Sequence, residues 1–363
     1  MKKAIVLVLA LCCLLGAVSC KRGTQEFRVD VFWYTFADTF LANVRTAMTA
    51  ELQMAEIQFQ HHDSTNSQSK QAEMIQTAIN RGTSVLIVNI VTTGSEDAAM
   101  NIVNMARRAD IPLIWFNREV SNAIVDAYPN SIFVGTDADE AGVIQGEAIA
   151  NFLLRPENWT GEISNFDLDN DGRINYIMFR GEHGNAEAFG RTLYSVQEAN
   201  RLLANRLTLT PSPANITSTM YPDDGVSNFF LYGNWSAAEA ANLMRTAITA
   251  HSLTSGAIEM VIANNDDQAL GAIEAMNEWG FNTSGGDRFI PTFGIDATTV
   301  AQEAIRAGRM TSSVLQDADK MAEIVVFLAE NIAYGKELFH EVEQFHMYPG
   351  VAKIRVPYSI VDH

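Results

Sequence analysis

The most informative stretch of the sequence is Asp167-Leu-Asp-Asn-Asp-Gly-Arg-Ile-Asn175, which is followed at once by the apolar run Tyr176–Phe179. Alternate carboxylates on a tight turn offer the oxygen ligands that a hard cation such as Ca²⁺ requires, at the spacing of the front of an EF-hand loop. The predicted ligands at loop positions 1, 3, 5, 7 and 9 are Asp167, Asp169, Asp171, the backbone carbonyl of Arg173, and Asn175, with Gly172 at the sharp turn.

The loop departs from an EF-hand at position 12, where a bidentate Glu would complete the cage. Met178 stands there instead, inside an apolar run that predicts a strand and not a helix. A carboxylate from a distant part of the chain must therefore close the site. The alternative interpretation is an Asp-rich surface turn that binds no cation.

The N-terminus predicts export. Lys2 and Lys3 precede the apolar run Ala4–Val18, which has the length of a secretory signal and is too short to span a bilayer. Ala17-Val-Ser-Cys20 is similar to a bacterial lipobox, so residues 1–20 are interpreted as a lipoprotein signal whose Cys20 is diacylated and anchors the protein. A plain signal peptide cleaved nearby is the alternative. The other two cysteines precede Cys20, which excludes disulfides and thiolate metal sites from the mature chain.

Composition describes a large acidic α/β protein. The 363 residues carry a net charge of −18, which argues against nucleic acid or an anionic membrane surface as a partner. About 340 residues remain after the signal, and their length suggests two domains. No nucleophile–base pair, phosphate loop or catalytic zinc motif is present, so we expect no enzyme. His61 and His62 are adjacent on a predicted strand and must face opposite ways, which makes them a poor metal pair.

Apolar runs of strand length alternate with helix-length segments, which predicts parallel sheets flanked by helices. The predicted strands include Val29–Tyr34, Val85–Ile90, Leu113–Phe116, Tyr176–Phe179, Met260–Ala263 and Thr292–Ile295. The predicted helices include Phe40–Leu52, Gln68–Asn80, Ser95–Ala109, Ala138–Leu154, Gly190–Leu203, Ala237–Ala250 and Ala269–Trp279.

Several of these strands run directly into amide or carboxylate side chains. The strand-end residues are Asn89, Asn117, Asn264, Asn265, Asp266 and Asp296. Ligands of open α/β sheets bind beyond the carboxyl ends of the strands. Because these ends come from both halves of the chain, the sequence predicts a polar cleft shared by two lobes.

The chain resembles the type I periplasmic binding proteins of sugar ABC transporters, and within them the galactose/glucose-binding family. The resemblance runs from about Val29 to Asp362. The segments that carry it are Asp38-Thr-Phe40, Asn66–Gln71, Val134-Gly-Thr-Asp137, Asp167–Asn175, Gly181-Glu182, Val261–Asp266, Phe293-Gly-Ile-Asp296 and Val356-Pro-Tyr358. In that family a Glu just before the second-lobe strand completes a structural calcium site, and the matching residue here is Glu259.

The resemblance implies a pyranose held between two aromatic rings inside a ring of polar side chains. Aromatic faces suit the apolar C–H faces of a sugar, while its hydroxyls need matched donors and acceptors. Phe40 and Trp235 match the two rings. The matching polar positions are Asp38, Asn89, Arg191, Asn265 and Asp296.

Three further ligand positions depart from the family pattern. Asn185 replaces a His, Glu187 replaces an Asp, and Gln316 replaces an Asn. The segment Pro211–Leu231, close to Trp235, is also longer than in the family. The class of ligand therefore follows from the resemblance, whereas the preference between glucose and galactose does not.

The resemblance implies two Rossmann-like lobes joined by three crossings, at Val134–Asp137, Leu315–Ala318 and Arg355–Tyr358. The first lobe would contain residues 27–134 and 317–354, and the second residues 135–316 and 355–363. We expect a monomeric, lipid-anchored periplasmic receptor that closes around a hexose and delivers it to an ABC permease. It would touch the membrane only through its anchor.

Other functions remain open at this stage. The same fold could present bound sugar to a chemoreceptor, or bind another pyranose or a pentose. The secretion signal and the lack of a helix-turn-helix argue against a transcription regulator. The sequence has no catalytic constellation, which argues against an enzyme. A calcium-stabilised adhesin would leave the aromatic and acidic cleft residues without a purpose.

Overall fold

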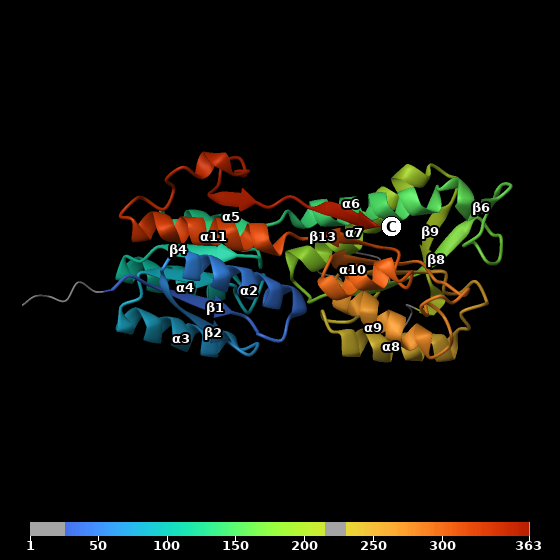
Figure 1. Ribbon diagram of the computed structural model, residues 1–363, viewed down its shortest axis with the longest axis horizontal. Coiled ribbons are helices and arrows are strands. Elements are labelled where there is room, and N and C mark those ends of the chain that lie inside the picture. The colour runs from blue at the N-terminus through green and yellow to red at the C-terminus, as the bar shows by residue number, and fades with distance from the viewer. Residues whose placement is uncertain (1–25, 215–229, 363) are drawn as a thin grey trace, which may run out of the picture.

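The computed structural model describes residues 26–214 and 230–362, which form two α/β lobes side by side (Figure 1). The predicted signal segment with Cys20 lies outside these residues, as does most of the long segment Pro211–Leu231. No helix in the two described ranges is long and apolar enough to cross a membrane.

The first lobe is built on a six-stranded parallel sheet. Its strands, in spatial order, are β14 (Lys353–Arg355), β5 (Ser131–Gly135), β4 (Leu113–Phe116), β3 (Val85–Val88), β1 (Arg28–Trp33) and β2 (Gln58–Asp63). One face packs on α2 (Thr39–Met54) and α11 (Ala318–Ala333). The other face packs on α3 (Gln68–Arg81), α4 (Glu96–Ala109) and the short α5 (Asn122–Asp126).

The second lobe repeats this plan. Its sheet has the order β10 (Leu231–Tyr232), β8 (Arg173–Arg180), β11 (Met260–Ala263), β12 (Thr292–Asp296), β13 (Ser312–Leu315) and β15 (Ser359–Asp362), and β9 (Thr208–Pro211) also pairs with β8. Only β15 runs antiparallel. The flanking helices are α6 (Ala138–Leu153) and α7 (Ala186–Leu203) on one face, and α8 (Ala237–Ala250), α9 (Asp266–Asn277) and α10 (Thr299–Arg306) on the other. A small hairpin joins β6 (Trp159–Thr160) to β7 (Ile163–Ser164).

The alternation of strands and helices predicted from the sequence is confirmed, and local chemistry explains where the elements begin. The central strands β3 and β4 are buried on both faces, which is typical of a parallel sheet covered by helices. Helix α7 begins at Ala186, four residues before its predicted start, because the Asn185 side chain accepts from the backbone N–H of Ala188 and caps it.

Three segments pass between the lobes: β5 to α6, β13 to α11, and β14 to β15. Figure 1 shows the late helix α11 lying among the early elements of the first lobe. Arg355 is the last residue of β14 and still pairs with Gly135 in the first sheet, so the last crossing predicted from the sequence starts at the final residue of that strand.

The two adjacent histidines of β2 face opposite sides of the first sheet, as predicted. The imidazole of His61 contacts Trp33 and Thr49. The imidazole of His62 lies beside Asp30, with 2.6 Å between His62 Nε2 and Asp30 Oδ1. They therefore offer no shared metal site.

Candidate functional site

A small cavity lies between the lobes, and we call it the inner cavity. Its walls are loops that follow β1 and β4 in the first lobe, and loops or helix starts that follow β8, β10, β11, β12 and β13 in the second. Parallel strands bring these ends to one edge of each sheet. The lining residues are Tyr34, Asp38, Phe40, Asn117, Arg118, Asn185, Glu187, Arg191, Trp235, Asn265, Asp296 and Gln316.

The structure brings nine of the ten predicted ligand-binding residues to this lining. Asn89 is the exception, because its fully buried side chain is used to hold the loops behind the wall. Its Oδ1 accepts from the backbone N–H of Tyr34 at 3.2 Å, and its Nδ2 donates to Phe116 O and Asn117 Oδ1. Asn89 therefore positions Tyr34 and Asn117 and does not reach the cavity itself.

The first-lobe wall is centred on Asp38, which has two roles. One carboxylate oxygen caps α2 by accepting from Leu41 N at 2.8 Å, and the other accepts from the Tyr34 hydroxyl at 2.7 Å. The guanidinium of Arg118 lies 4.1 Å from the centre of the Tyr34 ring. Phe40, buried beside them in the first turn of α2, supplies an aromatic surface.

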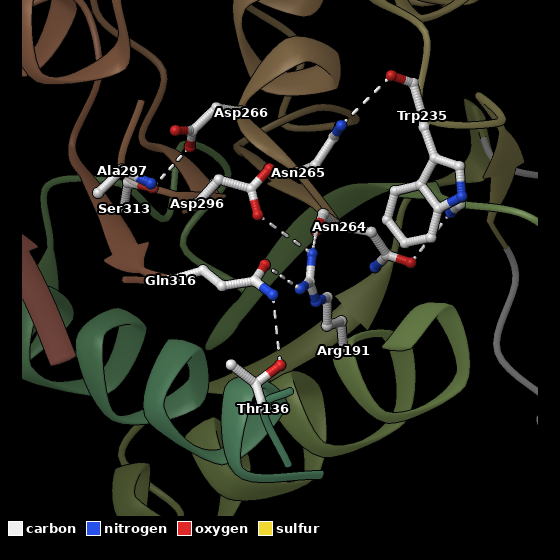
Figure 2. Close-up of polar contacts among 12 residues, drawn as sticks. Thr136, Arg191, Trp235, Asn264, Asn265, Asp266, Asp296, Ala297, Ser313 and Gln316 are labelled. Carbon is white, nitrogen blue, oxygen red and sulfur yellow. Dashed lines mark hydrogen bonds and ion pairs between the residues drawn. The ribbon is translucent and has the colours of Figure 1, made fainter. Parts of the chain in front are cut away.

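Arg191 is the polar centre of the second-lobe wall (Figure 2). Its Nη1 donates to Asn264 O at 2.8 Å and lies 3.6 Å from Asp296 Oδ1, while its Nη2 donates to Gln316 Oε1 and the Tyr358 hydroxyl. Burial alone would lower the pKa of Arg191, but Tyr358 and the carboxylates of Asp296 and Glu187 raise this pKa above its ordinary value. The guanidinium is therefore a fixed cation inside the cleft.

This network also reaches the crossings between the lobes. Thr136 in the first crossing accepts from Gln316 Nε2 in the second and from the Tyr358 hydroxyl in the third, at 3.3 and 2.7 Å. Arg191 donates to both Gln316 and Tyr358, so this cavity side chain is hydrogen-bonded to the second and third crossings, which form part of the hinge between the lobes.

Two buried carboxyl groups face the cavity from the second lobe. Burial raises the pKa of Asp296 well above its usual range, an effect that Arg191 partly opposes. Burial likewise raises the pKa of Glu187. Within the described part of the chain, Glu187 Oε1 and Arg191 Nε have no hydrogen-bond partner. Buried polar atoms are rarely left unpaired, so these atoms are suited to a ligand that brings hydroxyl groups.

Trp235 supplies the second aromatic wall in a left-handed backbone conformation, with φ at +65°. Its ring lies against Gly181, where an added Cβ would come within 2.2 Å of the indole, so only glycine leaves room for it. Asn265 caps α9 and donates from Nδ2 to the Trp235 carbonyl at 3.3 Å, which fixes the approach of the loop. Figure 2 shows the ring beside Arg191.

The sequence placed Asn117 at a strand end of the predicted cleft without naming it as a ligand contact, and it did not assign Tyr34 or Arg118 to the site. Tyr34 and Asn117 lie at the ends of predicted strands, and this position is the sequence feature that could have identified them as cavity residues. Arg118 gains its place from distant partners: the ring of Tyr34 and the carboxylate of Glu182 in the other lobe. No local pattern encodes that arrangement.

Contacts across the cleft hold the lobes together. Arg118 forms an ion pair with Glu182, and Thr39 Oγ1 donates to Asp267 Oδ2 at 2.8 Å. The inner cavity offers about 50 Å³, room for only a few waters at about 10–15 Å³ each. A ligand of hexose size can therefore enter only when the lobes or the cavity walls move apart.

A second candidate site is the carboxylate loop, defined as Asp167–Asn175 together with Glu259. Carboxylate oxygens of Asp167, Asp169 and Glu259 lie within 4.8 Å of one another. Glu259 precedes β11, and its two oxygens accept from Leu168 N at 2.6 Å and Asn175 N at 2.7 Å. Glu259 thus brings a carboxylate from a distant part of the chain to the loop, whose own position 12 is Met178.

The rest of the loop is shaped by backbone hydrogen bonds. Asp167 accepts from Asp171 N and Gly172 N, and Gly172 has φ at +81°. Asp171 does not belong to the three converging carboxylates, and its Oδ1 accepts from the backbone N–H of Arg173 at 2.9 Å. The Asn175 amide donates to Gly256 O at 2.8 Å. Arg173 begins β8.

Burial raises the pKa of Glu259 to about 7, with a further contribution from Asp169 and Asp167, against the opposing effect of the two amides. Three converging carboxylates with oxygen donors only are the donor set that a hard divalent cation prefers. The residues present therefore fit a calcium ion.

Known proteins share this architecture. A model of the periplasmic binding protein domain matches residues 29–337. The D-galactose/methyl-galactoside binding periplasmic protein of Haemophilus influenzae is 30% identical over 362 residues, which cover 99% of this chain and 97% of that protein. The ribose import binding protein of Salmonella typhimurium is 23% identical, covering 76% and 74%. An ABC transporter solute binding protein from Bacillus halodurans, solved with myo-inositol, has a TM-score of 0.66 at 25% identity, covering 94% and 96%.

Proposed function

The chain belongs to the periplasmic binding protein family, and from that membership we propose that it is an extracytoplasmic receptor that closes around a hexose, D-glucose or D-galactose, and delivers it to an ABC permease. Membership of a family of binding proteins supports capture and not catalysis. The observation that carries the choice of ligand is the convergence of two aromatic rings, Phe40 and Trp235, with buried acidic and basic side chains on one cavity between the lobes.

The chemistry of the cavity favours a sugar over other small solutes. Aromatic walls accept the apolar faces of a pyranose, and the Asp296 carboxyl and Arg191 guanidinium offer an acceptor and donors inside the same space. The unpartnered Glu187 Oε1 adds a further acceptor for a hydroxyl. Among the relatives, the protein from H. influenzae is named for D-galactose, and others are named for ribose or were solved with myo-inositol.

Closure of the two lobes is supported by the way in which the lobes share the lining of the inner cavity. Its acceptors and donors come from both lobes, so only the closed arrangement surrounds the ligand completely. Ligand that bridges the lobes shifts the population toward the closed form, which is the form a permease can distinguish. The hydrogen bonds from Arg191 to Gln316 and Tyr358 support a coupling between ligand and hinge.

The test is calorimetric titration of the purified protein with D-glucose and then D-galactose, after unfolding and refolding to remove sugar carried through purification. We expect binding of at least one sugar and its loss in Asp296→Ala, with no loss in Tyr334→Ala, an exposed control. Retained affinity in Asp296→Ala would remove this residue from the site. Absence of heat with both sugars would contradict the hexose assignment.

We propose in addition that the carboxylate loop holds a structural calcium ion, with Asp167, Asp169 and Glu259 as its carboxylate ligands. The other predicted ligands, Asp171, the Arg173 carbonyl and Asn175, lie on the same loop. A bound cation would offset the repulsion of the three converging carboxylates. Titration with CaCl₂ should show one site that Glu259→Gln weakens strongly; an unchanged affinity would refute the role of Glu259.

We propose, from the sequence of the first 20 residues, that Cys20 carries the lipid anchor on a bacterial membrane. Mass spectrometry of protein extracted from membranes should find an acylated N-terminal Cys20. An unmodified soluble protein cleaved at another position would identify a plain signal peptide.

A further inference from the structure

A second cavity of about 410 Å³ lies beside the inner cavity, and we call it the outer chamber. The two spaces share three wall residues, Tyr34, Arg118 and Trp235. The outer chamber is therefore the direct continuation of the inner cavity beyond this shared wall. Both lobes line it, so it has this shape only when they are in contact.

The outer chamber has the lining of a sugar site. Tyr232 adds an aromatic ring to those of Tyr34 and Trp235, and Asn66 and Asn234 add amide groups from the two lobes. Polar surface predominates over apolar surface in this lining. Aromatic faces combined with amides and charged groups suit a molecule that has both C–H faces and many hydroxyls.

The shared wall is held by contacts that a ligand can replace. The Tyr34 hydroxyl donates to Asp38, the same carboxylate that faces the inner cavity. Arg118 rests on the Tyr34 ring and pairs with Glu182, which itself lines the outer chamber. A hexose in the inner cavity needs more than the present 50 Å³, and displacement of the Tyr34 side chain would both enlarge that cavity and join it to the outer chamber.

We propose that the outer chamber is a second sugar subsite, so that the protein binds glycosides in which a hexose occupies the inner cavity and a second pyranose ring occupies the outer chamber. This inference rests on the proposed hexose-binding function and extends its ligand class from monosaccharides to disaccharides. The larger volume of the outer chamber and its three aromatic rings carry the assignment.

The test compares D-galactose and D-glucose with lactose, melibiose and cellobiose, by calorimetric titration of the purified protein and of Thr92→Trp. Thr92 is an exposed residue that lines the outer chamber and not the inner cavity, so a large ring there fills only the second subsite. We expect one or more disaccharides to bind within about tenfold of the better monosaccharide, and Thr92→Trp to weaken the disaccharide by about tenfold or more while changing the monosaccharide less than about twofold.

Thr77→Trp on the exposed side of α3 is the matched control and should change neither affinity. Tyr232→Ala, which removes an outer aromatic ring, gives a second variant with the same expected selectivity for the disaccharide. Binding of a monosaccharide without any disaccharide, or disaccharide affinity insensitive to both variants, would overturn the second subsite and leave the hexose function standing. Failure of all five sugars to bind would instead overturn the proposed function itself.

Discussion

The inner cavity is lined by three carboxyl groups, and three of the four in the carboxylate loop converge, yet the two sites balance this charge in different ways. In the inner cavity, Arg118 and Arg191 stand among the acidic side chains. In the carboxylate loop, Asp167, Asp169 and Glu259 accept hydrogen bonds from backbone N–H groups, and no Lys or Arg side chain of the described residues pairs with them.

This difference indicates what each site needs. A protein-supplied cation keeps the inner cavity charge-balanced before a neutral ligand arrives, so the ligand has only to satisfy hydrogen bonds. Converging carboxylates that no Lys or Arg side chain neutralises gain most from a cation in solution. The comparison therefore predicts opposite responses to changes in protein charge, metal and pH.

The largest expected effect is that of removing Arg191, one of the two cations of the inner cavity. Arg191→Met leaves buried carboxyl groups without their partner, and we expect about 3–5 kcal/mol to be lost from the free energy of unfolding. Sugar binding should be lost as well. Denaturant unfolding and calorimetry measure the two effects.

Arg245→Met is the matched control, because Arg245 forms an ion pair with Glu278 on the exposed surface. Such a pair contributes about 0–1 kcal/mol. If both variants lost the same small amount, the charge balance attributed to the inner cavity would be wrong.

Metal removal should have a smaller effect than Arg191→Met, and it should act only at the carboxylate loop. Calcium at about 100 times its Kd adds about 2.7 kcal/mol to the stability of a protein that binds it only when folded. A chelator should therefore lower the Tm of the parent. In Glu259→Gln the Tm should change little on addition of chelator; a parent Tm that ignores chelator would show that the loop is not a working calcium site.

The metal-free protein should also respond to pH. The pKa of Glu259 is raised from 4.5 to about 7 in the folded protein, so the folded state binds more protons than the unfolded state between these values. The contribution of Glu259 to the free energy of unfolding is thus fully present below pH 4.5 and is lost as pH rises through 7. With chelator, we expect stability to fall by up to about 3 kcal/mol between pH 5 and 8.

Urea unfolding at a series of pH values, with chelator and with excess calcium, measures this dependence. Calcium should reduce the fall, because a cation favours the charged carboxylate. Glu259→Gln should flatten the chelator profile. A parent profile with chelator that rises between pH 5 and 8 would contradict the environment assigned to Glu259.

Much of this architecture could be predicted from the sequence, because it is written in local patterns. The buried strand Leu113–Phe116 has the same bounds in the prediction and the structure, since its four apolar residues are followed by a polar turn. Asp296 was predicted at a strand end and lies there, in the cleft. Strand-end position and family resemblance together located most of the inner cavity.

What the sequence could not give is the outcome of contacts between distant residues. Asn89 was predicted as a ligand contact, but bonds to Tyr34 and Asn117 use its amide behind the wall. Arg118 was missed because its place depends on Glu182 in the other lobe. These assignments require the packing of the two lobes, which no local periodicity encodes.

The smallest expected effect concerns Glu187, whose Oε1 has no hydrogen-bond partner among the described residues. Glu187→Gln keeps the shape of a side chain whose pKa burial raises, and removes the cost of holding a charge there. We expect the ligand-free protein to gain about 0.5–1 kcal/mol in stability, while sugar affinity falls about tenfold because the charge-assisted acceptor is lost. Glu323→Gln, an exposed member of an i,i+3 pair, should change neither quantity. Urea unfolding and calorimetry decide between two interpretations. If Glu187→Gln both destabilised the protein and left affinity unchanged, Glu187 would serve the fold and not the ligand.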